Sequence, residues 1–293
     1  MCATILVMKS GTVLLVGRPN VGKSTLLNNL LHTKVSITSK QPQTTRSTIR
    51  GVYEDDRGQI IFIDTPGIFH KVENLVAKKV NQAAISAIGD EANLVLYVVD
   101  RARTRGEEEN KVVGLLRKLE IPKILVVNKI DVEKPNHYAE YDIFADEFDR
   151  KVEISALKEI HLKKLIDVIF EYLPVGKPLV DTKTLVYPVL GTDSKKFLSE
   201  LIREKVLLTM YEEIPHTVMV RVDEIKDKKE ILVIIAKIIT TDDKYKKMII
   251  GHGGAKIKEI GSMARKEIEV ASNKKVFLDL TVETDMHWPE KYL

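Results

Sequence analysis

An eight-residue stretch near the start of the chain limits the possible folds more than any other part of the sequence. Its residues are Gly17-Arg18-Pro19-Asn20-Val21-Gly22-Lys23-Ser24, with the spacing G-x-x-x-x-G-K-[ST]. The apolar run Val13–Val16 precedes it, and Thr25 opens an amphipathic helical pattern. Glycines let backbone N–H groups turn towards phosphate oxygens, and the start of a helix adds a favourable dipole. The stretch therefore predicts a strand, a phosphate-binding loop and a helix, with Lys23 at the β- and γ-phosphates and Ser24 on Mg²⁺.

The composition is that of a soluble globular protein, with 44% hydrophobic and 30% charged residues. A chain of 293 residues is long enough for two domains of ordinary size. Met1–Ser10 lacks the pattern of a signal peptide, and no apolar run is long enough to span a bilayer. The single cysteine, Cys2, excludes an intramolecular disulfide and a cysteine-based zinc site. We therefore expect a cytoplasmic protein.

The first part of the chain, to about Leu173, alternates apolar strands with longer amphipathic stretches. This pattern predicts an α/β fold with a mostly parallel sheet and helices on both faces. The expected strands are residues 12–16, 48–54, 59–63, 94–99, 123–127 and 151–154. The candidate motifs follow strand ends, which is where ligands bind in open α/β sheets.

Two of these motifs are suited to Mg²⁺ and the γ-phosphate. In the polar connection Gln43-Thr44-Thr45-Arg46 either threonine can bind the metal, and we favour Thr45 over Thr44. Strand 59–63 runs directly into Asp64-Thr65-Pro66-Gly67. A carboxylate that closes a buried strand is costly unless it is paired or bound to a metal. We expect Asp64 to support Mg²⁺ and the Gly67 N–H to reach the γ-phosphate.

A further motif, Asn128-Lys129-Ile130-Asp131, indicates the base. A carboxylate at Asp131 can accept hydrogen bonds from the guanine N1–H and N2 amine, a donor pair that adenine lacks. Asn128 either contacts the base edge or supports the loop, and the Lys129 stem can lie along the ring. The turn at Ser155-Ala156 is suited to presenting an N–H to guanine O6.

The stretch Pro174-Val175-Gly176-Lys177-Pro178 cannot continue a helix and reads as a domain boundary. We expect a first domain over residues 1–173, a linker over 174–188 and a second domain over 189–293. The second domain has the predicted order α-β-β-α-α-β. A Gly-x-x-Gly loop joins its second and third helices, within the run Ile250-Gly251-His252-Gly253-Gly254-Ala255-Lys256-Ile257-Lys258.

This second pattern resembles a type II KH domain, whose glycine loop lets nucleic acid approach the main chain. The overall net charge of +4 is too small to identify a nucleic-acid binder, but residues 244–275 contain nine Lys or Arg against three Glu. His252 either contacts RNA or faces solvent. Trp288 is expected to pack in a core or between domains rather than to stack on a base.

The motifs from Gly17 to Ala156 occur in the order and spacing of a Ras-like GTPase. Together with the Gly-x-x-Gly loop they resemble the Era family of bacterial GTPases over nearly the whole chain. The position after Gly67 is Ile68, where Ras-type enzymes place a glutamine that orients water, so we expect slow intrinsic hydrolysis. Asn20 is typical of related GTPases in which K⁺ assists, which makes K⁺ a candidate cofactor beside GTP, GDP and Mg²⁺.

The resemblance implies specific site residues. Catalytic roles fall on Lys23, Thr45 and Gly67, and metal contacts on Ser24, Thr45 and Asp64. The nucleotide contacts are implied at Gly17, Arg18, Pro19, Asn20, Val21, Gly22, Lys23, Ser24, Thr25, Asp64, Thr65, Pro66, Gly67, Ile68, Asn128, Lys129, Asp131, Ser155 and Ala156. The RNA contacts are implied at Ile250, Gly251, His252, Gly253, Gly254, Ala255, Lys256 and Lys258.

It also implies a role. The protein would be a monomer that binds 16S rRNA near its 3′ end, assists maturation of the 30S subunit, and associates peripherally with the inner membrane. Two alternatives stay open at this point. One is a GTPase that regulates membrane or cell-cycle events with RNA as a minor ligand, and the other is a non-enzymatic RNA-binding module with a structural nucleotide.

Overall fold

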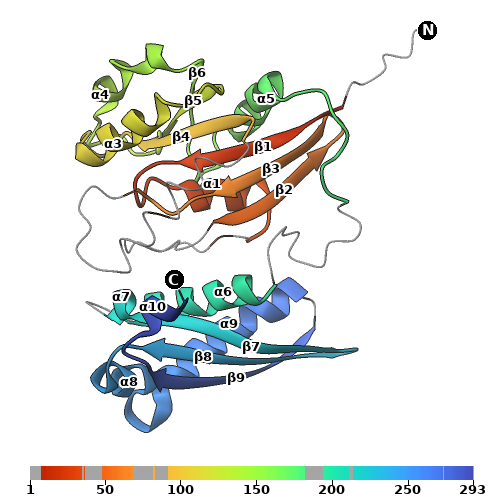
Figure 1. The fold of residues 1–293 in the computed structure, drawn as a ribbon, viewed down its shortest axis with the longest axis vertical. Coiled ribbons are helices and arrows are strands. Elements are labelled where there is room, and N and C mark those ends of the chain that lie inside the picture. The colour runs from red at the N-terminus through yellow and green to blue at the C-terminus, as the bar shows by residue number, and fades with distance from the viewer. Residues whose placement is uncertain are drawn as a thin grey trace.

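The structure is a computed structural model of the chain, and it shows two units, each with its own β-sheet (Figure 1). The first unit contains a six-stranded sheet and the second a three-stranded sheet. The residues that the structure describes are 8–34, 36, 48–68, 82, 92–181, 194–210, 214–272 and 274–292.

The sheet of the first unit has the strand order β2-β3-β1-β4-β5-β6. Strand β2 pairs antiparallel with β3, and the other neighbours are parallel. The strands are β1 (Lys9–Val16), β2 (Ile49–Asp55), β3 (Gly58–Asp64), β4 (Leu94–Asp100), β5 (Lys123–Asn128) and β6 (Arg150–Glu153). The mostly parallel sheet predicted from the apolar runs is therefore confirmed.

Helices cover both faces of this sheet, and the alternation of side chains along each strand decides which face is which. Leu15 and Leu96 belong to the apolar cluster that contains residues of α1 and α5, whereas Leu14 and Tyr97 belong to the cluster that contains residues of α3 and α4. Both faces are apolar because both are buried. The helices are α1 (Lys23–Leu30), α3 (Glu107–Leu116), α4 (Tyr138–Asp142) and α5 (Leu162–Tyr172), with a short 3-10 helix η1 (Ala145–Glu147).

The central strand β1 positions the glycine loop. It pairs with β3 on one side and with β4 on the other, so the chain changes direction across the sheet next to the end of β1. Such a switch point leaves a crevice at the carboxyl ends of the strands. The loops that follow β1, β3, β4 and β5 all begin at this crevice. Motifs that are far apart in the sequence therefore lie close together.

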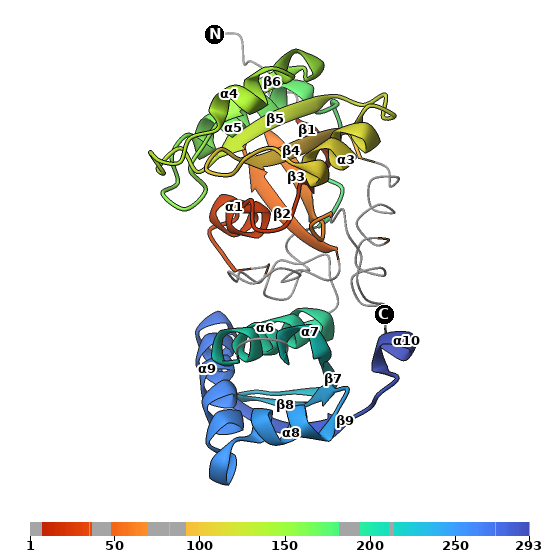
Figure 2. The same cartoon turned by 90° about the vertical axis from the view of Figure 1, so that its left-hand side faces the viewer.

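The second unit has the predicted order α-β-β-α-α-β, with two additional short helices, α7 and α10. Strand β8 pairs antiparallel with β7 and parallel with β9. Figure 2 shows α6 and α7 on the side of this unit that faces the first unit. The elements are α6 (Ser194–Thr209), α7 (Ile214–Thr217), β7 (Val218–Lys228), β8 (Ile231–Thr240), α8 (Asp243–Ile250), η3 (His252–Gly254), α9 (Ala255–Ser272), β9 (Lys275–Thr284) and α10 (Trp288–Tyr292).

Trp288 closes the outer side of this sheet. Its side chain is fully buried, packs with Ile239 and Met219, and donates a hydrogen bond of 2.9 Å from Nε1 to the Thr217 carbonyl. Met219 and Ile239 are opposite each other in the β7–β8 register. Trp288 is therefore a core residue, as predicted.

No helix in the described part of the chain is long and apolar enough to cross a bilayer.

Candidate active site

The glycine loop after β1 is held in place through its carbonyl oxygens. Five consecutive carbonyls, those of residues 17–21, accept hydrogen bonds from other parts of the first unit. The donors are Lys23 Nζ to Gly17 and Arg18 (3.0 Å each), Arg103 to Pro19 (3.2 Å), Lys129 Nζ to Asn20 (3.1 Å) and Asn128 Nδ2 to Val21 (2.8 Å). Because a trans peptide places its N–H opposite to its C=O, the peptide N–H groups of the loop point away from these donors. This is the arrangement that phosphate binding needs.

Two glycines are required by this packing. A Cβ at Gly17 would lie 2.4 Å from the Val98 carbonyl oxygen, and one at Gly22 would lie 2.3 Å from Asn128 Nδ2. Gly22 also has a φ of 102°, a left-handed value that side chains disfavour. The loop therefore sits closer to β4 and to the base-binding motif than any larger residue would allow.

Lys23 is the first residue of α1, and its ammonium group is buried beneath the loop. Burial lowers the pKa of Lys23 to about 8, although the negative charge of Asp64 acts in the opposite direction. Phosphate oxygens beside this amine would favour its charged form. The residue is placed as a phosphate ligand requires.

Asp64, at the end of β3, has the surroundings of a metal-supporting carboxylate. It is fully buried, and its Oδ2 accepts hydrogen bonds from Ser24 Oγ (2.7 Å) and Ser36 Oγ (2.8 Å). Its Oδ1 is buried without a hydrogen-bond partner among the described residues. Burial raises the pKa of Asp64, which a bound cation would reverse. Hydroxyl and carboxylate oxygens suit Mg²⁺, so Ser24 and Asp64 fit the metal. Thr44 and Thr45 lie outside the described residues.

Ser36 was not identified from the sequence. Its backbone is fixed by Asn28 of α1, which donates 2.7 Å to the Ser36 carbonyl and accepts 2.9 Å from the Ser36 N–H. These bonds place the Ser36 hydroxyl on Asp64, 28 residues further along the chain. A lone serine in a polar loop gives no sequence signal for such a contact.

The Asp64-Thr65-Pro66-Gly67 loop returns to the glycine loop. Thr65 Oγ1 donates 2.7 Å to the Leu15 carbonyl, and a Cβ at Gly67 would lie 2.6 Å from Pro19 N. The Ile68 N–H donates 3.3 Å to the Gly17 carbonyl, and its side chain is buried in an apolar cluster. The Ile68 side chain has no polar atom and no access to solvent, so it cannot orient a water molecule.

The base-binding motif is joined to two other loops through Asn128. Asn128 Oδ1 accepts hydrogen bonds from the N–H groups of Lys129 (2.7 Å) and Ala156 (2.9 Å), while Nδ2 holds Val21. Of the two roles left open for Asn128, these contacts favour loop support. Ser155 Oγ donates 2.5 Å to Asp131 Oδ1, which orients the carboxylate expected to select guanine.

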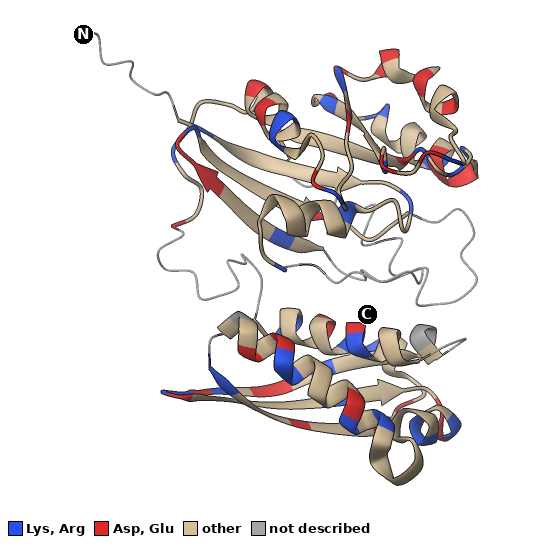
Figure 3. Cartoon of the chain, turned by 180° about the vertical axis from the view of Figure 1, so that it is seen from behind, with Lys and Arg blue, Asp and Glu red and all other residues tan. Residues whose placement is uncertain are grey.

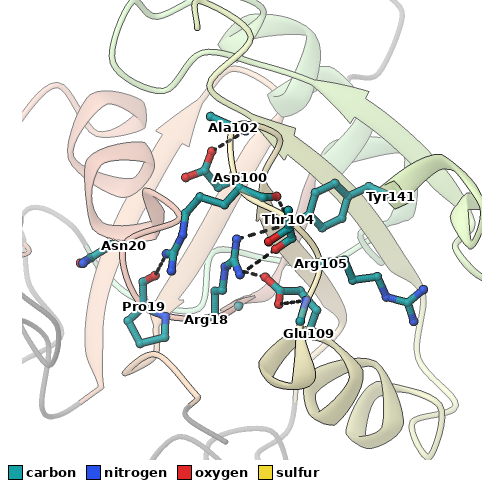
Figure 4. A network of polar contacts seen from close by, with 12 residues as sticks. Arg18, Pro19, Asn20, Asp100, Ala102, Thr104, Arg105, Glu109 and Tyr141 are labelled. Atoms are coloured by element: carbon teal, nitrogen blue, oxygen red, sulfur yellow. Dashed lines mark hydrogen bonds and ion pairs between the residues drawn. The ribbon is translucent and has the colours of Figure 1, made fainter. Parts of the chain in front are cut away.

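Figure 4 shows where the Arg18 side chain points: not into the phosphate loop but towards the start of α3. There its Nε forms an ion pair of 2.5 Å with Glu109 Oε1. From the sequence, the acidic run Glu107-Glu108-Glu109 is interpreted as solvated surface. This interpretation is wrong for Glu109, which is only 1% exposed. The buried partner is an arginine 91 positions away, so local charge pattern could not identify it.

The Gly-x-x-Gly loop of the second unit lies between α8 and α9. Gly253 and Gly254 have left-handed φ values of 56° and 79°, and no neighbouring heavy atom would lie closer than 4.0 Å to a Cβ at either one. At Gly251, φ is 73° and a Cβ would lie 3.0 Å from the Lys256 backbone nitrogen. The outer edge of the loop is thus open for a ligand, while Gly251 is required by close packing.

Comparison with known proteins identifies both units. A family model described as "50S ribosome-binding GTPase" matches residues 12–129, and a KH-domain model matches residues 213–288. GTPase Era from Halothermothrix orenii is 38% identical and is aligned over 97% of this chain and 95% of its own. This chain belongs to the Era family of GTPases.

Solved Era structures have the same architecture. A tyrosine-to-alanine variant of Aquifex aeolicus Era bound to GDP·AlF4⁻ matches with a TM-score of 0.89 at 36% identity, over 97% of both chains. An Era complex with MgGDPNP and nucleotides 1506–1542 of 16S ribosomal RNA matches with a TM-score of 0.88 at 35% identity, over 97% of this chain and 96% of that one. The predicted fold class is confirmed in both units.

The KH unit of this Era-family GTPase carries mixed charge along α9 and the segments that flank it. Figure 3 shows basic and acidic residues interspersed along α9. Lys258, beside the loop, is exposed, whereas Lys256 forms an ion pair of 3.0 Å with Glu259 and Lys274 one of 2.6 Å with Asp227. The local basic excess read from the sequence is therefore partly neutralised by neighbouring carboxylates.

One ion-pair cluster joins the two units. Lys34, two residues before Ser36, contacts Glu204 of α6 at 2.5 Å and Glu267 of α9 at 2.7 Å. Lys205 contacts the same two carboxylates. Although burial favours the neutral amine, these carboxylates raise the pKa of Lys205. Likewise the two lysines outweigh the burial of Glu267 and lower the pKa of its carboxyl. Nothing in the sequence pattern indicated this cluster.

Proposed function

We propose that this Era-family GTPase binds single-stranded RNA near the 3′ end of 16S rRNA through its KH unit and assists maturation of the 30S subunit. The proposal rests on one observation: the same chain contains a guanine-nucleotide site and an open Gly-x-x-Gly loop. The related Era structure with MgGDPNP and nucleotides 1506–1542 of 16S ribosomal RNA supports the choice of RNA. RNA contacts would come from residues 250–256 and Lys258.

In the nucleotide site, the amides of residues 17–25 and Lys23 would hold the phosphates of GTP or GDP. Ser24, Asp64 and Thr45 would hold Mg²⁺, which supplies charge stabilisation at the β- and γ-phosphates. The Gly67 N–H would contact the γ-phosphate, with Thr65, Pro66 and Ile68 lining the same loop. Asp131 would select guanine, with Asn128, Lys129, Ser155 and Ala156 supporting the base. Asn20 would contribute to a K⁺ site.

The segment 34–36 offers a route by which the nucleotide state gates RNA binding. Ser36 contacts Asp64, whereas Lys34 contacts α6 and α9 of the KH unit. Binding of Mg²⁺ and GTP would change the oxygens that surround Asp64, and Ser36 contacts Asp64 directly. Ser36 is only two residues from Lys34, which lies at the interface between the units. Such a coupling needs two arrangements of this segment, biased by the γ-phosphate.

We further propose a cytoplasmic monomer, able to associate peripherally with the inner membrane, with domains at 1–173 and 189–293 joined by a linker at 174–188. Ser10 N–H donates a hydrogen bond to Pro174 O (3.0 Å), and Gly176 N–H donates one to Met8 O (3.0 Å). These bonds attach the first part of the linker to the first unit.

The function is tested by RNA binding at fixed salt, because phosphate contacts make affinity salt-dependent. The probes are a short RNA that copies the 3′ end of 16S rRNA and a scrambled RNA, each with GDP and with a non-hydrolysable GTP analogue. We expect sequence-dependent binding that strengthens with the analogue. Gly253→Asp, which adds a negative side chain at the open edge, should weaken it. Equal binding of both RNAs would contradict the rRNA assignment and leave the GTPase assignment intact.

A further inference from the structure

Residues 100–106, which are the last residue of β4 and the connection to α3, contact both ends of the nucleotide site. At the base end, Asp100 Oδ2 forms an ion pair of 2.6 Å with Lys129 Nζ. Arg101 Nη2 donates hydrogen bonds to the carbonyls of Ile130 (2.9 Å) and Val132 (3.0 Å). Side chains of this segment thus hold the Lys129 side chain of the base-binding motif and the main-chain carbonyls of Ile130 and Val132.

At the phosphate end, the same segment contacts the glycine loop twice (Figure 4). Arg103 Nη1 donates 3.2 Å to the Pro19 carbonyl, and Arg18 Nη1 donates 3.1 Å to the Thr104 carbonyl. The two bonds run in opposite directions between the loop and the segment. They fix Pro19 and Arg18 relative to the base-binding motif through a few consecutive residues.

The ion pair between Arg18 and Glu109 anchors this arrangement. Both side chains are buried, 6% and 1% exposed, and Glu109 Oε2 also accepts a hydrogen bond of 3.0 Å from the Gly106 N–H at the start of α3. A carboxylate is favoured at a helix N-terminus. Tyr141 OH lies 3.5 Å from Arg18 Nη2 and donates 2.9 Å to the Arg103 carbonyl. The contact between Arg18 Nε and Glu109 Oε1 lacks hydrogen-bond geometry. The position of Arg18 is therefore held by this desolvated charge pair together with the hydrogen bonds of Arg18 Nη1 and Glu109 Oε2.

We propose that Arg18 and Glu109 are positioning residues for GTP hydrolysis, which hold the glycine loop in register with the base-binding motif. Neither side chain faces the inner side of the loop. Loss of the pair would weaken the contacts that the backbone of residues 18–20 makes with the phosphates. It would leave the recognition of guanine by Asp131 unchanged. The proposal rests on the GTPase activity of the family and is independent of RNA binding.

A double-mutant cycle separates positioning from folding. Glu109→Gln and Arg18→Met each leave one buried charge without its partner, so each single variant should be less stable. The double variant contains no unpaired charge and should regain most of the thermal midpoint. We expect its kcat and its GDP-to-GMP affinity ratio to stay at least tenfold below wild type. The ratio of GDP to IDP affinity, which reports on Asp131, should not change.

Glu108→Gln is the matched control, because it makes the same change one residue earlier and should leave all of these quantities at their wild-type values. Recovery of kcat and of the GDP-to-GMP ratio together with stability in the double variant would overturn the proposal, because the pair would then only support the fold. A changed GDP-to-IDP ratio would also overturn it.

Discussion

Removal of the Lys34 charge should loosen the contact between the two units. Lys34→Met keeps the length of the side chain and removes both ion pairs, to Glu204 and Glu267. The cluster then holds two carboxylates and only Lys205. Lys34 is 32% exposed, whereas Glu204 is 1% exposed. Exposed pairs contribute up to about 1 kcal/mol and breaking a buried pair costs about 3 to 5 kcal/mol. For this half-buried case we expect a loss of about 1 to 2 kcal/mol, a factor of about 5 to 30 in the population with the units in contact.

The measurement is a distance distribution between spin labels on the two units of the full chain. Cysteines replace the exposed residues Lys118 and Lys229, in a Cys2→Ser background. We expect Lys34→Met to raise the population at new distances by that factor. Lys274→Met is the control, because Lys274 is 33% exposed and forms an ion pair with Asp227 within the KH unit.

Charge balance supplies a second check on the same reasoning. Lys34→Met combined with Glu267→Gln leaves Lys205 with Glu204 alone, so the pair is again neutral and part of the contact between the units should return. The reasoning is refuted if Lys34→Met has the distance distribution of wild type, or if Lys274→Met changes it equally.

Two other perturbations follow from the described contacts, and a third follows from the resemblance at Asn20. Asp64→Ala should lower GTP turnover at least about a hundredfold and remove its dependence on Mg²⁺, measured as phosphate release; wild-type turnover would contradict the metal assignment. Turnover should be higher in KCl than in NaCl at matched ionic strength, and equal rates would exclude a K⁺ site at Asn20. The pKa of Glu267 is lowered in the folded state, so its contribution to the contact between the units is present above the ordinary carboxylate pKa and is lost as pH falls through the folded value. The spin-label distances should therefore shift more with acid in wild type than in Glu267→Gln, which keeps only the pair between Lys34 and Glu204 across this contact.

The parts of this protein that sequence predicted well are those encoded by neighbouring residues. Strand β4 is a run of consecutive apolar residues bounded by Asn93 and Asp100, so its two buried faces can be read directly. The glycine loop requires specific residues within one short stretch. The same holds for the turn after Asp64, because the strand, the carboxylate and the turn are contiguous.

The parts that sequence did not predict depend on pairs from distant segments. Glu109 has the same local pattern as its exposed neighbour Glu107, and only the approach of Arg18 explains its burial. Lys34 and Glu204 are 170 positions apart, so their pairing depends on how the units meet. A charged residue in an amphipathic helix is usually solvated, and pattern alone carries no information about the exceptions.

The two ion-pair systems act on different segments near the nucleotide site. Arg18 and Glu109 immobilise residues 17–20 before the nucleotide arrives, and this pre-organisation lowers the cost of binding the phosphates. Lys34 and Ser36, by contrast, belong to the segment that follows α1, and their partners lie in a different unit and at the metal-supporting carboxylate. A rigid phosphate loop beside a segment with two distant partners is what a nucleotide-dependent switch needs. In the proposed switch, the loop would hold the phosphates in a fixed geometry, and the segment would exchange one set of partners for another when the nucleotide changes.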